Sequence, residues 1–347
     1  MQTLSHIISE RGKSTVSHEK DLDYLTISAR IHAMENRLLN HERMERMIEA
    51  RELSEAAKVL TECGYEEMGQ VTAQAIEDTL AKAQEALFHD LNTAVGNRAL
   101  LDVFRCSYDY HNAKVLVKGE ALGANQESLL VGGGRYAPQK LAEDYGREDL
   151  RGCSDIFRRG VSRARETLGS TGDPQMADFI LDRAYFEELT DLAKKADSKF
   201  LQGYVALTID MANLRSCVRA SRLNKGADFL QQVLVTGGSV SVRTLATTPG
   251  SELGNLLRTG PLAQAAATGA ALSAPGSGAL TDFERQCDDA VMAYLEDGRR
   301  VPFGDQPIVG YLYARQAEMT AIRTILSGRM AGLDGNTIRQ RLRRTYG

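Results

Sequence analysis

The chain has 347 residues, 43% hydrophobic and 25% charged, which is the composition of a globular protein large enough for two or three domains. Its formal net charge of −4 argues against a general nucleic-acid-binding protein, because such proteins usually carry a basic surplus. Five widely spaced cysteines without a CxxC pair argue against a disulfide framework and favour free thiols in a reducing compartment.

The sequence contains no segment that we expect to enter or cross a membrane. The first residues, MQTLSHIISERGKS, lack the apolar run of a secretory signal. No other segment approaches the ~18 consecutive apolar residues of a membrane-spanning helix. We therefore expect any role at a membrane to depend on a partner protein.

Apolar residues recur every three to four positions in the first third of the chain, and this period predicts a series of helices. Residues 24–62 follow it, with a short helix beginning at Ser54 and Gly64 placed to end that helix. Further helices are predicted over residues 66–91 and over residues 97–118, the second ending at Gly119.

The middle of the chain combines a glycine-rich turn with two long helices. LLVGGG, at residues 129–134, predicts a turn, and Pro138 suits the first turn of a helix that follows it. Helix breakers within residues 146–174 predict short helices and loops. Strong helical periods then cover residues 178–196 and 200–221.

The last third is also helical, with one atypical segment. Residues 233–242 are strand-like, but we discount a strand because the repeat partner of this stretch, residues 129–134, is not strand-like. Residues 247–281 are rich in Gly, Ala, Ser, Thr and Pro and predict either a flexible loop or a poorly packed helix. Helices are then predicted over 282–295 and 308–326, separated by a turn with Pro302, Gly304 and Pro307 and followed by a terminal helix capped by Gly335-Asn336. The sequence therefore predicts an all-α protein.

Two short elements recur along the chain and indicate a repeated unit. The first occurs as LTECGY, LAEDYG, LATTPG and LRRTYG, each preceded by a possible helix start at Ser54, Arg135, Ser239 or Asn336. The second, which we call the signature, occurs as Asp109-Tyr-His-Asn112-Ala-Lys114, as Asp210-Met-Ala-Asn213-Leu-Arg215 and, more weakly, as Glu318-Met-Thr-Ala321-Ile-Arg323. Its acidic residues are 101 and 108 residues apart, which is the size of a small domain. We predict three similar helical domains, at residues 1–125, 126–230 and 231–347.

The signature places a carboxylate on a helix face that becomes apolar one turn later. A half-buried carboxylate must be hydrogen-bonded, paired with a cation or protonated. A general acid or a metal ligand would meet this requirement, but catalytic sites are rarely built in equivalent form in every repeat. We favour a structural anchor and expect Asp109 and Asp210 to be buried and hydrogen-bonded.

Several motifs are similar to binding sites but lack the context that such sites need. GKST at residues 12–15 has neither the earlier glycine nor the preceding strand of a phosphate-binding loop. GGGR at residues 132–135 could present N–H groups and an arginine to phosphate, but its repeat partner at residues 237–239 has no arginine, so we favour a turn. The six histidines form no metal-binding spacing, and no GxSxG nucleophile is present. We therefore expect no catalytic, cofactor or metal site.

Taken together, these residues resemble the C subunits of the V-type/A-type rotary ATPases, whose eukaryotic counterparts are called d. The resemblance is carried by segments spread over nearly the whole chain: ARIHAMENRLL at residues 29–39, Tyr108 to Asn112 with Lys114, Leu181 to Phe186, Pro307 to Leu312, Glu318, Ile322-Arg323, Ile325-Leu326, Gly328-Arg329 and Leu342 to Gly347. Ala321 departs from the pattern, because the other two copies have asparagine at this position.

The resemblance implies a funnel of three similar helical domains around a pseudo-threefold axis. It also implies a non-catalytic component of the central stalk, on the cytoplasmic face of the membrane. Such a component would be a socket that couples the rotor shaft, made of the D and F subunits, to the membrane proteolipid ring, so that ATP hydrolysis or synthesis is linked to proton or sodium transport.

The C-terminal segment carries seven arginines from Arg315 onward, against Glu318 and Asp334. A solvated helix face explains this charge without any partner. The resemblance adds a second interpretation, in which some of the last four contact the rotor shaft: Arg339, Arg341, Arg343 and Arg344.

Two other classes of function remain open at this point. The chain could be a free helical scaffold that binds a soluble regulatory partner, and copurification from membranes would separate this from a component of a rotary ATPase. It could also be an enzyme that uses the GGGR turn, which a nucleotide-binding assay would test.

Overall fold

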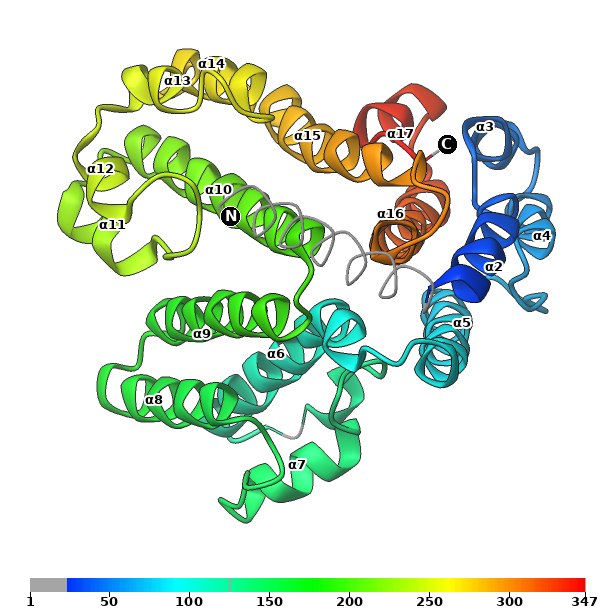
Figure 1. Cartoon of the computed structure of the whole chain (residues 1–347), viewed down its shortest axis with the longest axis horizontal. Helices are drawn as coiled ribbons and strands as arrows, with labels where there is room; N and C mark the ends of the chain where they lie inside the picture. The colour runs from blue at the N-terminus through cyan, green and yellow to red at the C-terminus, as the bar shows by residue number, and fades with distance from the viewer. Residues whose placement is uncertain (1–23, 125, 347) are drawn as a thin grey trace, which may run out of the picture. The chain divides into compact units, whose positions relative to one another are not determined.

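The computed structural model describes residues 24–124 and 126–346, and every element in these ranges is a helix (Figure 1). This confirms the all-α prediction. The expectations for the first residues of the chain, on a secretory signal and on GKST at residues 12–15, lie outside the described residues.

The chain divides into two compact units. Of the described residues, those within Met1–Leu80, Thr93–Gly96 and Met292–Gly347 form the terminal unit, and those within Ala81–Asn92 and Asn97–Val291 form the central unit. The chain passes between the units at four points, two of them within α5 (Ala73–Ala94) and one within α15 (Thr281–Arg299). The three domains expected from the repeats, and their arrangement, stay predictions.

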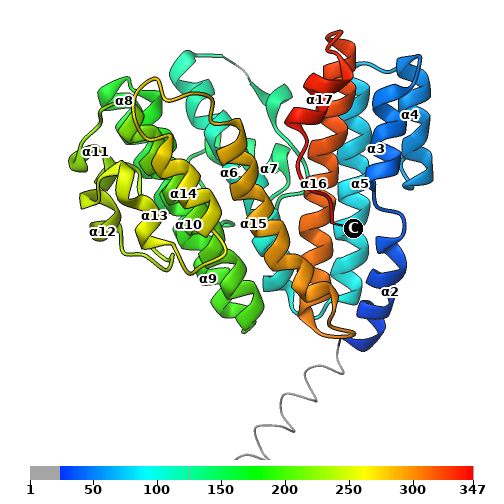
Figure 2. The same cartoon turned by 90° about the horizontal axis from the view of Figure 1, so that it is seen from above.

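The terminal unit is built around α16 (Asp305–Met330). Its buried residues include Ile308, Leu312 and Ile322, and they lie on several sides of the helix, as expected for a helix enclosed by others. Figure 2 shows α16 beside α3 and α17. The helices that pack on it are α2 (Leu25–Glu35), α3 (His41–Glu49), α4 (Leu53–Glu62) and α17 (Gly335–Arg341).

The central unit contains two packed groups of helices. In the first, α6 (Arg98–Leu122), α8 (Asp155–Thr171) and α9 (Pro174–Lys195) pack on one another (Figure 1). In the second, α10 (Lys199–Arg222) packs on α9 and on the shorter helices that follow it. The remaining elements are η1 (Glu127–Leu129), α7 (Pro138–Gly146), α11 (Ala227–Val233), α12 (Val242–Thr247), η2 (Gly250–Glu252), α13 (Leu253–Leu256) and α14 (Ala263–Ala271).

Several helix ends follow the capping signals in the sequence. The side chains of Ser154, Asp173 and Ser198 accept hydrogen bonds from the first turns of α8, α9 and α10. Pro138 is in the first turn of α7, and Gly64, with a φ of 85°, directly follows the end of α4, as predicted.

The predicted helix starts at Arg135 and Ser239 are wrong by three residues. The helices begin instead at Pro138 and Val242, because the N–H groups of Arg135 and Ser239 donate to the signature aspartates. The terminal helix is capped by Asp334 rather than Gly335-Asn336, since the Asp334 carboxylate accepts from the N–H of Thr337.

Two of the predicted helix interruptions are not found. Helix α6 continues past Gly119 to Leu122 and is followed by Gly123, whose left-handed φ of 60° suits a C-terminal cap. The loops and short helices expected over residues 146–174 are largely one helix, α8. A side chain at Gly160 would overlap Ala184, so this glycine permits the close approach of α8 and α9.

The predicted turn at residues 302–307 ends earlier than expected, because Pro307 lies in the first turn of α16. Residues 247–281 contain η2, α13 and α14 together with the non-helical stretches 257–262 and 272–280, so the segment has both helix and loop. Leu253 and Ala266 are buried there, and Gly269 lies against Val218 of α10.

Candidate functional site: the signature helices and the C-terminal arginines

Each of the three signature helices carries a buried carboxylate. Asp109 on α6 is fully buried, Asp210 on α10 is 7% exposed and Glu318 on α16 is 4% exposed. The first two are thus buried and hydrogen-bonded, as the sequence predicts. Within the described ranges, no three His, Cys, Asp or Glu residues gather in a way that could hold a metal ion.

The three carboxylates have the same kind of partner, a backbone N–H group two or three residues before a short helix. The donors are Arg135 N to Asp109 at 2.9 Å, Ser239 N to Asp210 at 2.9 Å and Leu39 N to Glu318 at 2.7 Å, ahead of α7, α12 and α3. A negative charge at the start of a helix is favourable, because the N–H groups there lack intrahelical partners. Each signature carboxylate is therefore placed to anchor a short helix to a long one.

The asparagine of the signature fixes the turn that follows. Asn112 donates to Val131 O at 2.9 Å and accepts from Val131 N at 2.9 Å. Asn213 does the same with Val235, at 2.8 and 2.9 Å. Each amide thus satisfies both backbone groups of one turn residue. The third copy cannot make this contact, since Ala321 has no polar side chain.

The glycines of the two turns allow the backbone to reach the carboxylates. A Cβ atom at Gly134 would overlap Oδ1 of Asp109, and one at Gly238 would overlap Oδ1 of Asp210. GGGR is therefore a turn, as favoured from the sequence. The guanidinium of Arg135 lies inside the protein, between two carboxylates.

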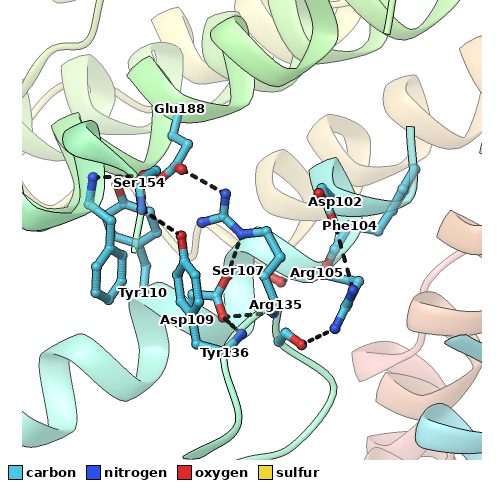
Figure 3. A network of polar contacts seen from close by, with 12 residues as sticks. Asp102, Phe104, Arg105, Ser107, Asp109, Tyr110, Arg135, Tyr136, Ser154 and Glu188 are labelled. Atoms are coloured by element: carbon cyan, nitrogen blue, oxygen red, sulfur yellow. Dashed lines mark hydrogen bonds and ion pairs between the residues drawn. The ribbon is translucent and has the colours of Figure 1, made fainter. Parts of the chain in front are cut away.

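Figure 3 shows this buried cluster around Arg135. Its guanidinium donates to Asp109 Oδ2 at 2.6 Å and to Glu188 Oε1 of α9 at 2.6 Å, and only 10% of the side chain is exposed. The hydroxyl of Tyr110 donates to Glu188 Oε2 at 2.8 Å. The Arg135 guanidinium also lies over the ring of Tyr136, at 5.0 Å from its centroid. One arginine thus joins α6, α9 and the turn before α7.

The cluster contains two carboxylates and one guanidinium, so it has a surplus of buried negative charge. Burial raises the pKa of Asp109 to about 6, against the opposing effects of Arg135 and of the Arg135 and Tyr136 N–H groups. The desolvation of a buried pair can exceed the attraction between its charges. Asp109 is therefore expected to titrate well above its ordinary range.

This shift predicts the sign of a pH effect on stability. Between its ordinary pKa of 3.8 and its folded pKa of about 6, Asp109 binds a proton in the folded state but not in the unfolded state. We expect the free energy of unfolding, measured relative to an Asp109→Asn variant, to rise as the pH falls from about 7 to about 5. Urea unfolding of both proteins across this range tests it, and a constant difference would contradict it.

The third copy has its own arginine, which the sequence analysis did not single out. Arg315, three residues before Glu318, pairs with this carboxylate and lies over the ring of Tyr65, at 4.8 Å from the centroid. The Tyr65 hydroxyl donates to Glu318 Oε2 at 2.8 Å. In the second copy Ser239 stands where the first has Arg135, so the aspartate there has no arginine from the turn.

The cation at the end of each signature pairs with an acidic residue of another helix. Lys114 Nζ lies 2.6 Å from Asp182 of α9, Arg215 lies 2.6 Å from Glu284 and 2.8 Å from Asp288 of α15, and Arg323 lies 2.9 Å from Glu77 of α5. The sequence analysis identified the three cations but not their partners. Each signature helix is therefore held at two positions five residues apart: its carboxylate binds a turn, and its cation pairs with another helix.

The C-terminal arginines fall into two groups. Arg339 pairs with Glu45 and Glu49 of α3, and Arg344 pairs with Glu296, so each is already held by an acidic residue of its own unit. Arg341, the last residue of α17, is exposed, and Arg343 donates to its carbonyl oxygen. Contact of these arginines with a partner stays a prediction.

Comparison with protein-family models matches residues 27–341 to the ATP synthase (C/AC39) subunit. The chain is 20% identical to the C subunit of the V-type sodium ATPase of Enterococcus hirae, covering 94% of this chain and 99% of the relative. It is 27% identical to the C subunit of the A-type ATP synthase of Haloferax volcanii, covering 91% and 96%. It is also 27% identical to the C subunit of the V-type ATP synthase of Thermus thermophilus, covering 60% and 67%. Of the helices in the described part of the chain, none has the length and apolar character needed to span a membrane.

Proposed function

The chain belongs to the family of ATP synthase (C/AC39) subunits, and from this premise we propose that it is the central-stalk component that couples the rotor shaft to the membrane ring. In this role it holds the D and F subunits on one side and the proteolipid ring on the other. It lies on the cytoplasmic face of the membrane and transmits rotation linked to proton or sodium transport.

One observation carries this proposal: the family match runs from residue 27 to residue 341, and relatives named as C subunits align along almost their full length. The match therefore includes all three signature helices, rather than one shared segment.

The internal contacts support a mechanical role. A part that transmits torque must keep its helices in fixed positions under load. Each signature helix is held by a buried carboxylate at a turn and by an ion pair to another helix. Buried polar contacts with good geometry resist displacement, because moving either partner leaves an unsatisfied group.

The proposal assigns no catalytic step to this chain. In it, ATP is made or hydrolysed on other subunits, and this chain provides two interfaces. Each must be large enough for lasting attachment, which for stable complexes means burying roughly 1,200–2,000 Å² or more.

Reconstitution tests the assignment directly. The purified chain should co-elute with a D–F complex and, separately, bind detergent-solubilised proteolipid ring. Copurification from membranes should recover the other ATPase subunits. Binding to neither component, with recovery only of a soluble regulatory protein, would instead identify a free helical scaffold.

Arg341 offers a specific prediction within this function. Arg339 and Arg344 have acidic partners of their own, whereas Arg341 is exposed at the end of α17. Charged groups at the rim of an interface mainly set the association rate. We expect Arg341→Glu to slow association with the D–F shaft by about threefold to tenfold at low salt, with the effect fading as salt screens the charge.

The matched control is Lys58→Glu, which makes the same charge change at an exposed position on α4. Stopped-flow association rates at several salt concentrations provide the measurement. If Arg341→Glu and Lys58→Glu slow association equally, only net charge matters and Arg341 has no particular role. Binding of the unmodified chain to the shaft tests the function itself.

A further inference from the structure

The third signature differs from the other two in the origin of its turn. Arg135 follows Asp109 by 26 residues and Ser239 follows Asp210 by 29 residues, so chain connectivity keeps each turn near its long helix. Glu318 instead binds the N–H group of Leu39, which lies 279 residues earlier in the sequence. The third copy is therefore completed by a segment from the opposite end of the chain.

In the third copy, therefore, no short chain segment links the turn to the signature helix. A short connecting loop keeps its two ends at high effective concentration, and that advantage falls as the loop becomes longer. Residues 36–50, which contain the turn and α3, must be held on α16 and α17 by noncovalent contacts. We call residues 36–50 the strap.

The strap is held by opposite charges at the two ends of α3. Glu318 accepts from Leu39 N, just before the helix begins. At the C-terminal end of α3, Arg329 donates to three carbonyl oxygens. These belong to Met47, at 3.1 Å, to Ile48, and to Ala50, at 2.5 Å. A carboxylate at the start and a guanidinium at the end both match the helix dipole.

Arg329 belongs to the third copy alone. It lies eleven residues after the signature carboxylate, where the first copy has Glu120 and the second has Ser221. Arg339 adds a second cation, with Nη2 at 2.6 Å from Glu45 and 2.8 Å from Glu49. The third copy, whose turn is distant in sequence, thus has two additional arginines, and both bind the strap.

The strap also buries apolar side chains, because Leu38 and Leu39 in its turn are 7% and 2% exposed. Met44, Met47 and Ile48 are the buried residues of α3, a helix of only nine residues. Isolated helices of this length are unstable in water. The strap therefore depends on packing against α4, α16 and α17, and the charged contacts at the two ends of α3 add to the apolar ones.

We propose that the strap opens and closes on α16 and α17 while the central unit stays folded, so that the third signature can be taken apart alone. Opening breaks the Glu318–Leu39 contact and frees the carbonyl groups at the end of α3. It is a local event with a free energy below that of global unfolding, and salt promotes it.

Hydrogen exchange of the full chain, followed by mass spectrometry, tests this proposal. Peptides within residues 36–50 should exchange faster than peptides of α10, and added salt should speed the first without changing the second. The Leu39 amide reports the contact directly, because its acceptor is Glu318. Exchange of the strap at the same rate as α10, with no response to salt, would overturn the proposal.

Variants show whether the charges are responsible. Arg339→Glu should speed exchange of the strap by about tenfold or more, as expected when a charged hydrogen bond is lost. Adding Glu45→Arg and Glu49→Arg should restore slow exchange by reversing the pairs. The matched control, Arg323→Glu, reverses a charge in the same unit, on α16, where the partner is Glu77 of α5 rather than the strap.

The control decides specificity. If Arg323→Glu speeds exchange of the strap as much as Arg339→Glu does, the effect comes from general loosening of the terminal unit, and the proposal fails. If the reversed pairs do not restore slow exchange, the contact is not held by charge and the proposal also fails.

Discussion

Replacing Arg135 by methionine is expected to lower the free energy of unfolding by about 3–5 kcal/mol at pH 8, the usual effect of removing one partner of a buried ion pair. Asp109 and Glu188, which are 0% and 2% exposed, would remain buried without their cation. Urea unfolding followed by circular dichroism measures the change. The loss should be smaller near pH 5, because Asp109 is then protonated in the folded protein.

Two further variants separate charge from shape in this cluster. Adding Asp109→Asn and Glu188→Gln to Arg135→Met should recover much of the lost stability, since no charge is then left unpaired. Lys114→Met removes a cation from the same repeat, but its pair with Asp182 is partly exposed and should contribute less than about 1 kcal/mol. An effect of Arg135→Met no larger than that of Lys114→Met would contradict the buried-cluster interpretation.

Replacing Gly134 by alanine should also destabilise the protein strongly. The added Cβ overlaps the Asp109 carboxylate, which must then move away from the N–H groups of Arg135 and Tyr136. Overpacking alone costs about 1–3 kcal/mol, and the lost hydrogen bonds add to this. Gly238→Ala should have a similar effect through Asp210.

The control for both is Gly169→Ala, in helix α8, where an added Cβ meets nothing within 4 Å. Alanine is favoured over glycine in a helix by roughly 0.5–1 kcal/mol, so this variant should be slightly more stable than the wild type. Thermal unfolding of the three variants gives the comparison. If Gly134→Ala is as stable as Gly169→Ala, the turn does not need its close approach to Asp109.

The helices and the signature could be predicted from the sequence because their causes are local. Apolar periods fix the long helices, and the spacing of Asp109 and Asn112 places both on one face. Burial of Asp109 and Asp210 follows from the same pattern. Errors within the helices have physical causes as well: α8 includes Gly160, whose missing side chain favours packing against α9.

The partners of the signature residues could not be predicted in this way. Glu188, which binds Arg135, lies on another helix, and Leu39, which binds Glu318, is 279 residues distant. No period or capping rule connects such positions, because their proximity is a result of the tertiary fold. Arg315 is the exception: it stands three residues before Glu318, a spacing at which helical side chains are neighbours, and could have been recognised.

The contact between Leu39 and Glu318 also sets an order of events during synthesis. A ribosome that adds ~5–20 residues per second completes Leu39 on the order of tens of seconds before Glu318. The central unit is made in that interval, while Met44, Met47 and Ile48 have only α4 beside them and not yet α16 or α17. The first helices of the nascent chain must therefore wait for the last ones, and in that interval they are a natural target for chaperones.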